Sequence, residues 1–321
     1  MNWNQIKATT CVADVGINQD INYAAMYILL PIDHIDISKC QVKKKNIVRH
    51  GTSEGSIVFA GWKNFKRGVP HRFTASNNFK NATSLSMSLG DDRYASLAIY
   101  TNKVHICGCK QETEIRACIN HLLQRLYAIN EALSYVIKHK EQLIQYMRDK
   151  FKGSECFNSD LKVHSFDYNP LKFYEDYGRV SYALDPYLRT VRYLEDAIVF
   201  IEWCTLIAYV VQPCKIAYID YHNIHYDMNL GFKVELSALA YLAQNNNFQV
   251  EYSNVNDAYV HIVVPFEELD EDTTKRKKSR FVINVYKTGA VKVYGPSFKG
   301  IQREFDKFYQ FVQEHIELLM P

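Results

Sequence analysis

The residues of this 321-residue chain that could perform chemistry lie apart in the sequence and follow no catalytic spacing. Cys107 and Cys109 would share one face of a strand, yet none of the eight cysteines belongs to a CxxC pair. His222 and His225 are three residues apart, a spacing that points them to opposite faces of a strand. The sequence therefore predicts no metal site.

The acidic clusters give no catalytic arrangement either. Asp91 and Asp92, and the run Asp270–Glu271–Asp272, fall in predicted hairpin loops, where solvated charge is expected. No Gly-rich phosphate loop joins a predicted strand to a helix, which argues against a nucleotide-binding enzyme. We expect no catalysis and no cofactor.

Composition and charge narrow the remaining classes of function. A net charge of +3 is small for a chain that simply coats nucleic acid. The most apolar run, residues 197–211, is too short to span a bilayer and reads as a buried helix or strand. No secretory signal opens the sequence. We expect an intracellular, reducing compartment and no membrane partner.

The sharpest pattern is FVINVYKTGAVKVYG, residues 281–295. It predicts a β-hairpin that turns at Gly289, a residue able to take a positive φ. Its two faces differ in chemistry. One face is apolar and contains Phe281, Ile283, Val285, Val291 and Val293; the other contains Asn284, Tyr286, Lys292 and Tyr294. Such a hairpin buries one face against helices and leaves the other for solvent or a partner.

A second stretch, LAIYTNKVHICGCK (residues 97–110), follows the same order. Ala98, Tyr100, His105 and Cys107 lie on its polar face, opposite Leu97, Ile99, Val104 and Ile106. A long amphipathic helix pattern follows each hairpin, over 115–133 and 301–319, and a Gly-ended strand with a shorter helix precedes each. The sequence predicts a duplicated α+β unit.

The repeated unit resembles the duplicated domain of the TATA-box-binding protein (TBP) family. Asn223–Ile224 and Asn229–Leu230–Gly231 match the family's first strand and the Asn-Leu-Gly that follows it. Val285–Tyr286, Gly289 and Gly295 match its hairpin with the spacing kept. Weaker matches in the first half are Asp14–Val15–Gly16, Ile99–Tyr100 and Cys107–Gly108–Cys109–Lys110. The divergent, enlarged form looks like the TBP-like proteins of large nucleocytoplasmic DNA viruses.

The resemblance implies two TBP-like repeats that form a saddle-shaped, curved antiparallel sheet with helices on the convex face. The N-terminal repeat would cover residues 1–150, with an insertion at about 31–75. The C-terminal repeat would cover 196–321, after an inter-repeat connector at 151–195.

The resemblance also implies a transcription initiation factor that binds and bends AT-rich promoter DNA through the minor groove. Tyr286 and Tyr100 stand where the family has wedge phenylalanines, and Asn223 where it has a minor-groove asparagine. The full set of expected DNA contacts is Tyr100, Tyr286, Asn223, Asn284, Lys292, Tyr294, His105, Cys107, Ala98, His225 and Lys110. The implied partners are double-stranded DNA, a TFIIB-like factor and RNA polymerase subunits, in the nucleus or in a cytoplasmic viral factory or virion, with no small-molecule substrate.

Several positions depart from the family pattern and keep alternatives open. Ala8 is the partner position of Asn223, and Cys107 and Tyr294 replace base-contacting threonines. Phe79 is the nearest candidate for a second wedge in the first half. A more polar, less symmetric face also suits a TBP-like protein-interaction module that has lost direct DNA binding. Some DNA glycosylases and one type of ribonuclease H carry a similar domain, but their extra catalytic residues are not found in this sequence.

Overall fold

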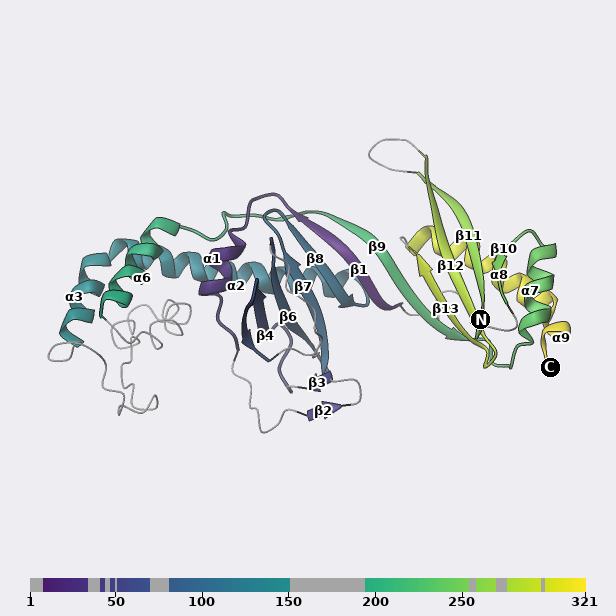
Figure 1. Cartoon of the computed structure of the whole chain (residues 1–321). Helices are drawn as coiled ribbons and strands as arrows, with labels where there is room; N and C mark the ends of the chain where they lie inside the picture. The colour runs from purple at the N-terminus through teal and green to yellow at the C-terminus, as the bar shows by residue number, and fades with distance from the viewer. Residues whose placement is uncertain are drawn as a thin grey trace. The chain divides into compact units, whose positions relative to one another are not determined.

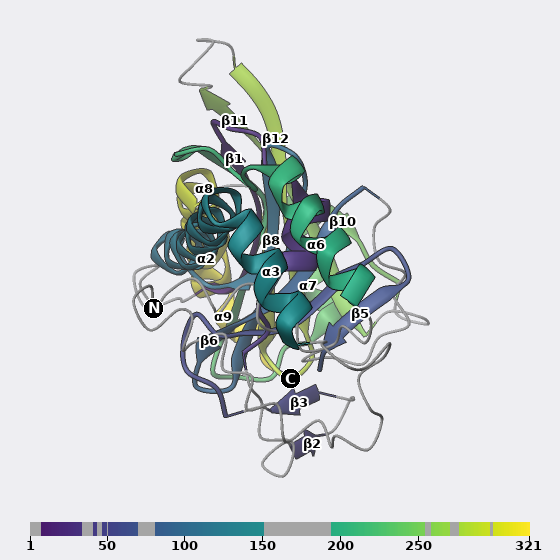
Figure 2. The same cartoon turned by 90° about the vertical axis from the view of Figure 1, so that its left-hand side faces the viewer.

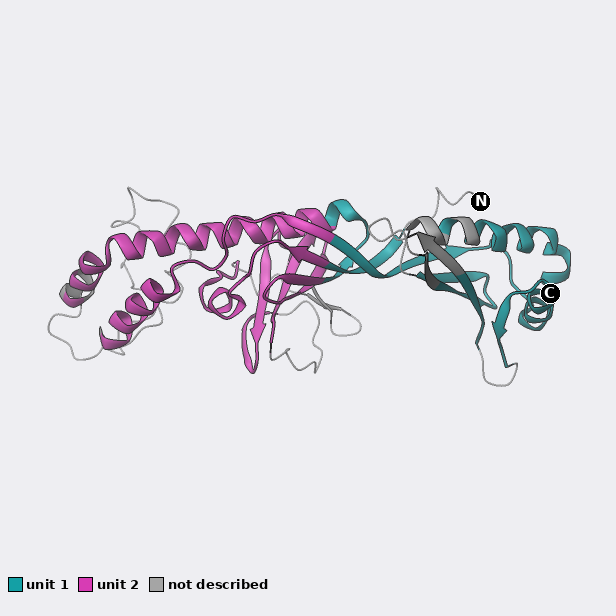
Figure 3. Cartoon of the chain, turned by 90° about the horizontal axis from the view of Figure 1, so that it is seen from above, with its two compact units in different colours: residues 1–14, 106–114, 219–321 teal, residues 15–105, 115–218 magenta. Residues whose placement is uncertain are grey.

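A computed structural model describes residues 8–33, 41–43, 47–49, 51–69, 81–150, 194–253, 258–269, 276–295 and 298–321. The chain forms two compact units: unit 1 contains residues 1–14, 106–114 and 219–321, and unit 2 contains 15–105 and 115–218 (Figure 3). Strands β1 (Ala8–Ile17), β8 (Lys103–Cys109) and β9 (Ile216–Asn229) contribute residues to both units. Phe79 and most of the predicted connector lie outside the described residues.

Unit 1 contains an antiparallel sheet in the order β10-β11-β12-β13-β9-β1-β8. Its further strands are β10 (Gln249–Glu251), β11 (Tyr259–Leu269), β12 (Arg276–Tyr286) and β13 (Ala290–Gly295). Its helices are α7 (Leu236–Asn245), α8 (Phe298–Glu314) and α9 (Ile316–Leu319). Helices α7 and α8 both contact β11 (Figure 1).

The core of unit 1 confirms the predicted two-faced hairpin. The alternating side chains Phe281, Ile283, Val285, Val291 and Val293 are completely buried. Phenylalanines of α8 are buried with them, and Phe308 contacts Phe305, Phe311 and Phe248 at ring-centroid distances of 6.0 to 6.3 Å. Burying a side chain of this size stabilises the fold by about 1.5–3 kcal/mol. Because these side chains are buried in the core, the residues that alternate with them must lie on the opposite face of the sheet.

The helix predicted over 301–319 breaks into α8 and α9 at His315. The ring Nδ1 of His315 donates a hydrogen bond of 2.9 Å to the carbonyl of Phe311, and its backbone leaves the helical conformation. A side chain that bonds the carbonyl of the last turn competes with the next helical hydrogen bond.

Unit 2 contains strands in the order β8-β7-β6-β4-β5. They are β4 (Ile57–Trp62), β5 (Phe65–Gly68), β6 (Thr83–Gly90) and β7 (Arg93–Ile99), and a separate two-stranded sheet pairs β2 (Gln41–Lys43) with β3 (Ile47–Arg49). Helix α1 (Tyr23–Leu29) packs on β4 and β6. The predicted first hairpin is confirmed: Tyr100 N–H donates to the carbonyl of Lys103 at 2.8 Å, across the turn between β7 and β8.

The long helix that follows this hairpin is also confirmed, as α2 (Glu112–Lys138). Its apolar stripe is completely buried and consists of Ile115, Ile119, Leu122, Leu126, Ile129 and Leu133. Its predicted continuation is interrupted at His139 and resumes as α3 (Lys140–Lys150). Helix α6 (Leu194–Ile207) lies beside α3 (Figures 1 and 2).

The apolar run at 197–211 is thus largely helical, but only part of it is buried. Val199 is 63% exposed and Leu206 is 82% exposed, whereas Ala197 and Cys204 are fully buried. No helix among the described residues has the length and apolar character needed to cross a membrane. The mixed α/β class with a large antiparallel sheet agrees with the sequence. The saddle and the repeat boundaries stay predictions, because compact units reflect spatial contacts and not internal repetition.

Two glycines of unit 1 allow the conformational and the steric roles of glycine to be separated. Gly289 has φ +81° and an added Cβ would lie 2.0 Å from the carbonyl oxygen of Phe232, while Gly231 has φ +87° with nothing within 4 Å. We expect Gly231→Ala to lower the free energy of unfolding by about 1 kcal/mol, the conformational cost alone. Gly289→Ala should lower it by about 3 kcal/mol, because the carbonyl must also move.

Urea denaturation followed by circular dichroism measures both variants. Equal losses would show that the close approach of Phe232 does not constrain the hairpin turn.

Candidate functional site

The face of the unit 1 sheet opposite the apolar core carries a row of polar residues. Strand register aligns His261 with Asn284, Asn284 with Lys292, and Lys292 with Asp227. Glu251 of β10 lies opposite His261 and extends the row. Because side chains alternate along a strand, these residues point away from the buried Phe281 and Val293 set. The hairpin register therefore brings together groups from five strands.

Aromatic side chains flank this polar row. The rings of Tyr259 and Tyr286 lie 5.2 Å apart, and the Nζ of Lys292 lies 5.8 Å from the centroid of the Tyr286 ring. On the other side of the row, His225 meets Tyr294 edge-on at 4.7 Å and 81°. All five side chains are half-buried. The face thus presents ring surfaces that are held in place by one another.

The electrostatics of the face keep two of its groups neutral. Burial lowers the pKa of His225, Asp227 opposes that shift, and the charge of Lys292 adds to it. Burial also raises the pKa of Tyr294, with smaller contributions from Tyr286, Asp227 and Tyr259. At neutral pH the imidazole of His225 and the phenol of Tyr294 are therefore uncharged.

Asn284, a predicted contact residue, is only 9% exposed. Its Oδ1 lies 2.8 Å from Nδ1 of His261. A buried carboxamide needs such a partner, since an unmade hydrogen bond costs about 1–3 kcal/mol. Asn284 therefore orients the neighbouring imidazole.

The other predicted residues of unit 1 have varied surroundings. Asn223 on β9 and Cys107 on β8 are half-buried. Lys110 is exposed just beyond β8; its N–H donates to Glu114 Oε2 at 2.7 Å, and its carbonyl accepts from Cys11 Sγ at 3.3 Å. These backbone bonds fix the point where the strand ends and leave the lysine side chain pointing to solvent.

Three predicted residues belong to unit 2. Ala98 is 6% exposed and pairs with Ser84 across the strands, so its methyl group lies in a covered position. Tyr100 is half-buried, with Lys103 Nζ 5.4 Å from its ring centroid. The same cation-over-ring contact occurs at Lys292 and Tyr286 in unit 1. His105 is half-buried on β8.

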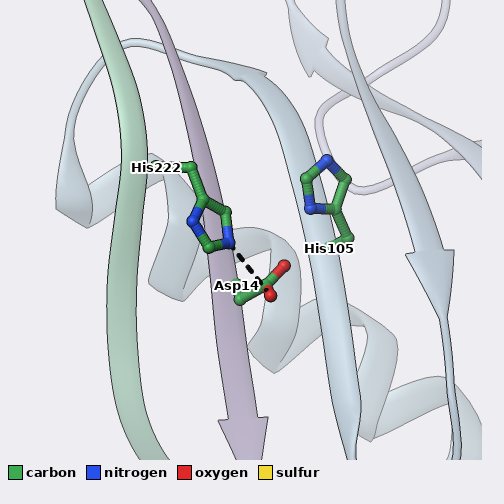
Figure 4. A group of neighbouring side chains, drawn as sticks. All are labelled: Asp14, His105 and His222. Carbon is green, nitrogen blue, oxygen red and sulfur yellow. Dashed lines mark ion pairs between the residues drawn. The ribbon is translucent and has the colours of Figure 1, made fainter. Parts of the chain in front are cut away.

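His222 has a partner that the sequence did not suggest. Its Nε2 lies 3.0 Å from Oδ2 of Asp14, and both residues belong to unit 1 (Figure 4). His225 instead packs on Tyr294. The two histidines of β9 therefore have separate environments within this unit.

Sequence reasoning missed Tyr259, His261 and Asp227. Tyr259 and His261 alternate with Val260 and Ile262, which are completely buried. That alternation was readable in the sequence as a further two-faced strand. Asp227 alternates in the same way with Tyr226, whose ring is 2% exposed.

Opposing charges beside His225 predict opposite responses to two substitutions. Lys292→Gln should raise the pKa of His225 toward its ordinary value of 6.5, whereas Asp227→Asn should lower it further. Imidazole titration by NMR measures both. Because protonation of His225 opposes folding, unit 1 should also lose stability as the pH falls below 6.5. Shifts of equal sign in the two variants would contradict this account of the face.

Comparisons with known proteins leave the family open. No protein-family model matches the chain, and no curated protein matches it. The solved structure of Methanococcus jannaschii TBP is similar at a TM-score of 0.38 and 12% sequence identity, over 97% of this chain and 98% of that chain.

Proposed function

We propose that this chain is a DNA-binding transcription initiation factor of the TATA-binding-protein type, which binds and bends AT-rich promoter DNA through the minor groove. One observation carries the proposal: the sheet of unit 1 is packed with phenylalanines on one face and presents half-buried Tyr259, Tyr286 and Tyr294 on the other. A minor-groove reader needs a sheet that is covered on one side and aromatic on the other.

Tyr286 is the residue that suits the role of a wedge. It is held between Tyr259, at 5.2 Å, and the ammonium group of Lys292, at 5.8 Å. Inserting a side chain between base pairs costs a few kcal/mol per unstacked step, which new contacts must offset. A ring already fixed by its neighbours loses less side-chain entropy on binding, so more of the contact energy remains.

Polar residues of the same face supply the remaining interactions. The half-buried Asn223 carries donors for the acceptors of A·T pairs, and Lys292 supplies a positive charge close to Tyr286. In unit 2, Tyr100 and Lys103 form a second contact between an aromatic ring and an ammonium group. In this proposal the two rings, Tyr286 and Tyr100, belong to the C-terminal and N-terminal repeats respectively.

The proposal also includes the binding partners and the cellular localisation of the chain. The chain acts by binding and not by chemistry, together with a TFIIB-like factor and RNA polymerase subunits. It works in the nucleus, or in the cytoplasmic factory or virion of a large DNA virus. The resemblance of the hairpin and strand motifs supports these points.

A protein-interaction module is the second candidate, and the ends of the polar row favour it. Asp227 lies opposite Lys292, and Glu251 lies opposite His261. Both carboxylates would repel nearby phosphates, while they could pair with basic groups of a protein partner. The choice between the two functions depends on whether duplex DNA binds at all.

Removing the ring of Tyr286 should weaken DNA binding about tenfold, the loss typical of an aromatic side chain that stacks on bases. Fluorescence anisotropy measures the Kd for AT-rich and GC-rich duplexes of equal length, at low and at physiological salt. Wild-type protein should prefer the AT-rich duplex, and its affinity should fall steeply as salt rises.

Tyr241→Ala is the matched control, because Tyr241 is 66% exposed on helix α7, away from the sheet face. Its Kd should equal that of the wild type. Absence of duplex binding at any salt would reject the DNA-binding function in favour of the protein-interaction module.

The two repeats should contribute unequally. Asn223 of the C-terminal repeat has no counterpart at Ala8 of the N-terminal repeat, so the C-terminal repeat has a base-reading amide that the N-terminal repeat lacks. We therefore expect Tyr286→Ala to raise the Kd for the AT-rich duplex more than Tyr100→Ala does. The same anisotropy titration compares them, and a larger loss with Tyr100→Ala would show that the N-terminal repeat dominates.

A further inference from the structure

His261 and Asn284 form a fixed pair on the open face of unit 1. They stand directly opposite each other on β11 and β12, and Nδ1 of His261 lies 2.8 Å from Oδ1 of Asn284. Asn284 is 9% exposed, whereas His261 is half-buried. The amide therefore lies under the surface, and the imidazole is the more accessible partner.

This contact fixes the tautomer of the imidazole. A carboxamide oxygen only accepts hydrogen bonds, so Nδ1 of His261 must donate the proton. A neutral imidazole has one N–H group, and its other nitrogen is then an acceptor. Nε2 of His261 accordingly presents a lone pair.

A lone pair on this face distinguishes the two kinds of base pair. In the minor groove, A·T pairs present only acceptors, while G·C pairs add the exocyclic amine of guanine, a donor. An acceptor that meets an A·T pair faces a second lone pair. The same acceptor gains a hydrogen bond from a G·C pair.

We propose that His261 is a specificity-determining residue that accepts a hydrogen bond from the guanine amine, so that unit 1 reads one G·C pair within an AT-rich element. This assignment rests on the proposed DNA-binding function. Lys292, opposite Asn284 and two strands away from His261, adds a donor. The row then offers both an acceptor and a donor, a pattern that a uniform A·T tract does not match.

Modified bases test the proposal on the wild-type protein. A single G·C pair is moved stepwise through an otherwise A·T duplex, and each duplex is compared with one in which inosine replaces guanine. Inosine lacks only the minor-groove amine. Anisotropy at pH 8 should show guanine binding about fivefold more tightly than inosine at one or two positions, the loss expected for one hydrogen bond. 2,6-Diaminopurine, which adds the amine to an A·T pair, should tighten binding at the same positions.

Two variants assign the effect to His261. His261→Phe keeps a ring beside Tyr259, whose centroid lies 6.5 Å away, and should abolish the guanine advantage. His261→Lys replaces the acceptor by a donor and should favour A·T at those positions. Tyr241→Ala should leave the advantage unchanged. Circular dichroism confirms that each variant is folded, and either folded variant suffices for the assignment.

The outcomes separate this inference from the function on which it rests. Equal affinity for guanine and inosine at every position, with duplex binding intact, overturns the role of His261 and leaves the DNA-binding function standing. A guanine advantage that survives in both variants shows that another residue accepts the hydrogen bond. Failure to bind any duplex rejects the function and the inference together.

Discussion

The alternation of apolar and polar side chains along β12 and β13 is the constraint on which the rest of unit 1 depends. Phe281, Ile283 and Val293 are completely buried, so a shift of one residue in register would bring polar groups into that core. Gly289 holds the register, because its φ of +81° closes the turn and its missing Cβ admits the carbonyl of Phe232. The polar face is thus determined by packing on the opposite side of the sheet.

This register produces a polar face whose side chains are held by hydrogen bonds and aromatic contacts more than by net charge. The charges of Asp227 and Lys292 oppose each other in their effect on His225. Asn284 and His261 form a bond that needs no charge. A net charge of +3 over 321 residues is in keeping with this balance. Recognition by such a face would depend on shape and on the placement of donors and acceptors.

Features that depend on the local spacing of apolar residues could be predicted from the sequence. Features that depend on contacts between particular side chains or between distant segments could not. The hairpin faces and the buried stripe of α2 follow from local spacing, and the structure confirms both. The break at His315 depends on one side chain bonding the carbonyl of Phe311, which no spacing rule contains. The pairing of His261 with Asn284 depends on the register between β11 and β12, which local spacing does not give. Leu206 is 82% exposed although it belongs to the most apolar run of the chain, and its apolar neighbours in sequence do not indicate this.

The spacing of the polar row bears on how a duplex could meet it. Neighbouring strands lie about 4.8 Å apart, whereas stacked base pairs rise about 3.4 Å. His261 and Lys292, two strands apart, therefore cannot match successive pairs of an undistorted duplex. A wedge such as Tyr286, adjacent to the row, would increase the local rise by unstacking a step. Bending and base reading would then be one event, since the ring creates the spacing at which the fixed acceptor meets a single pair.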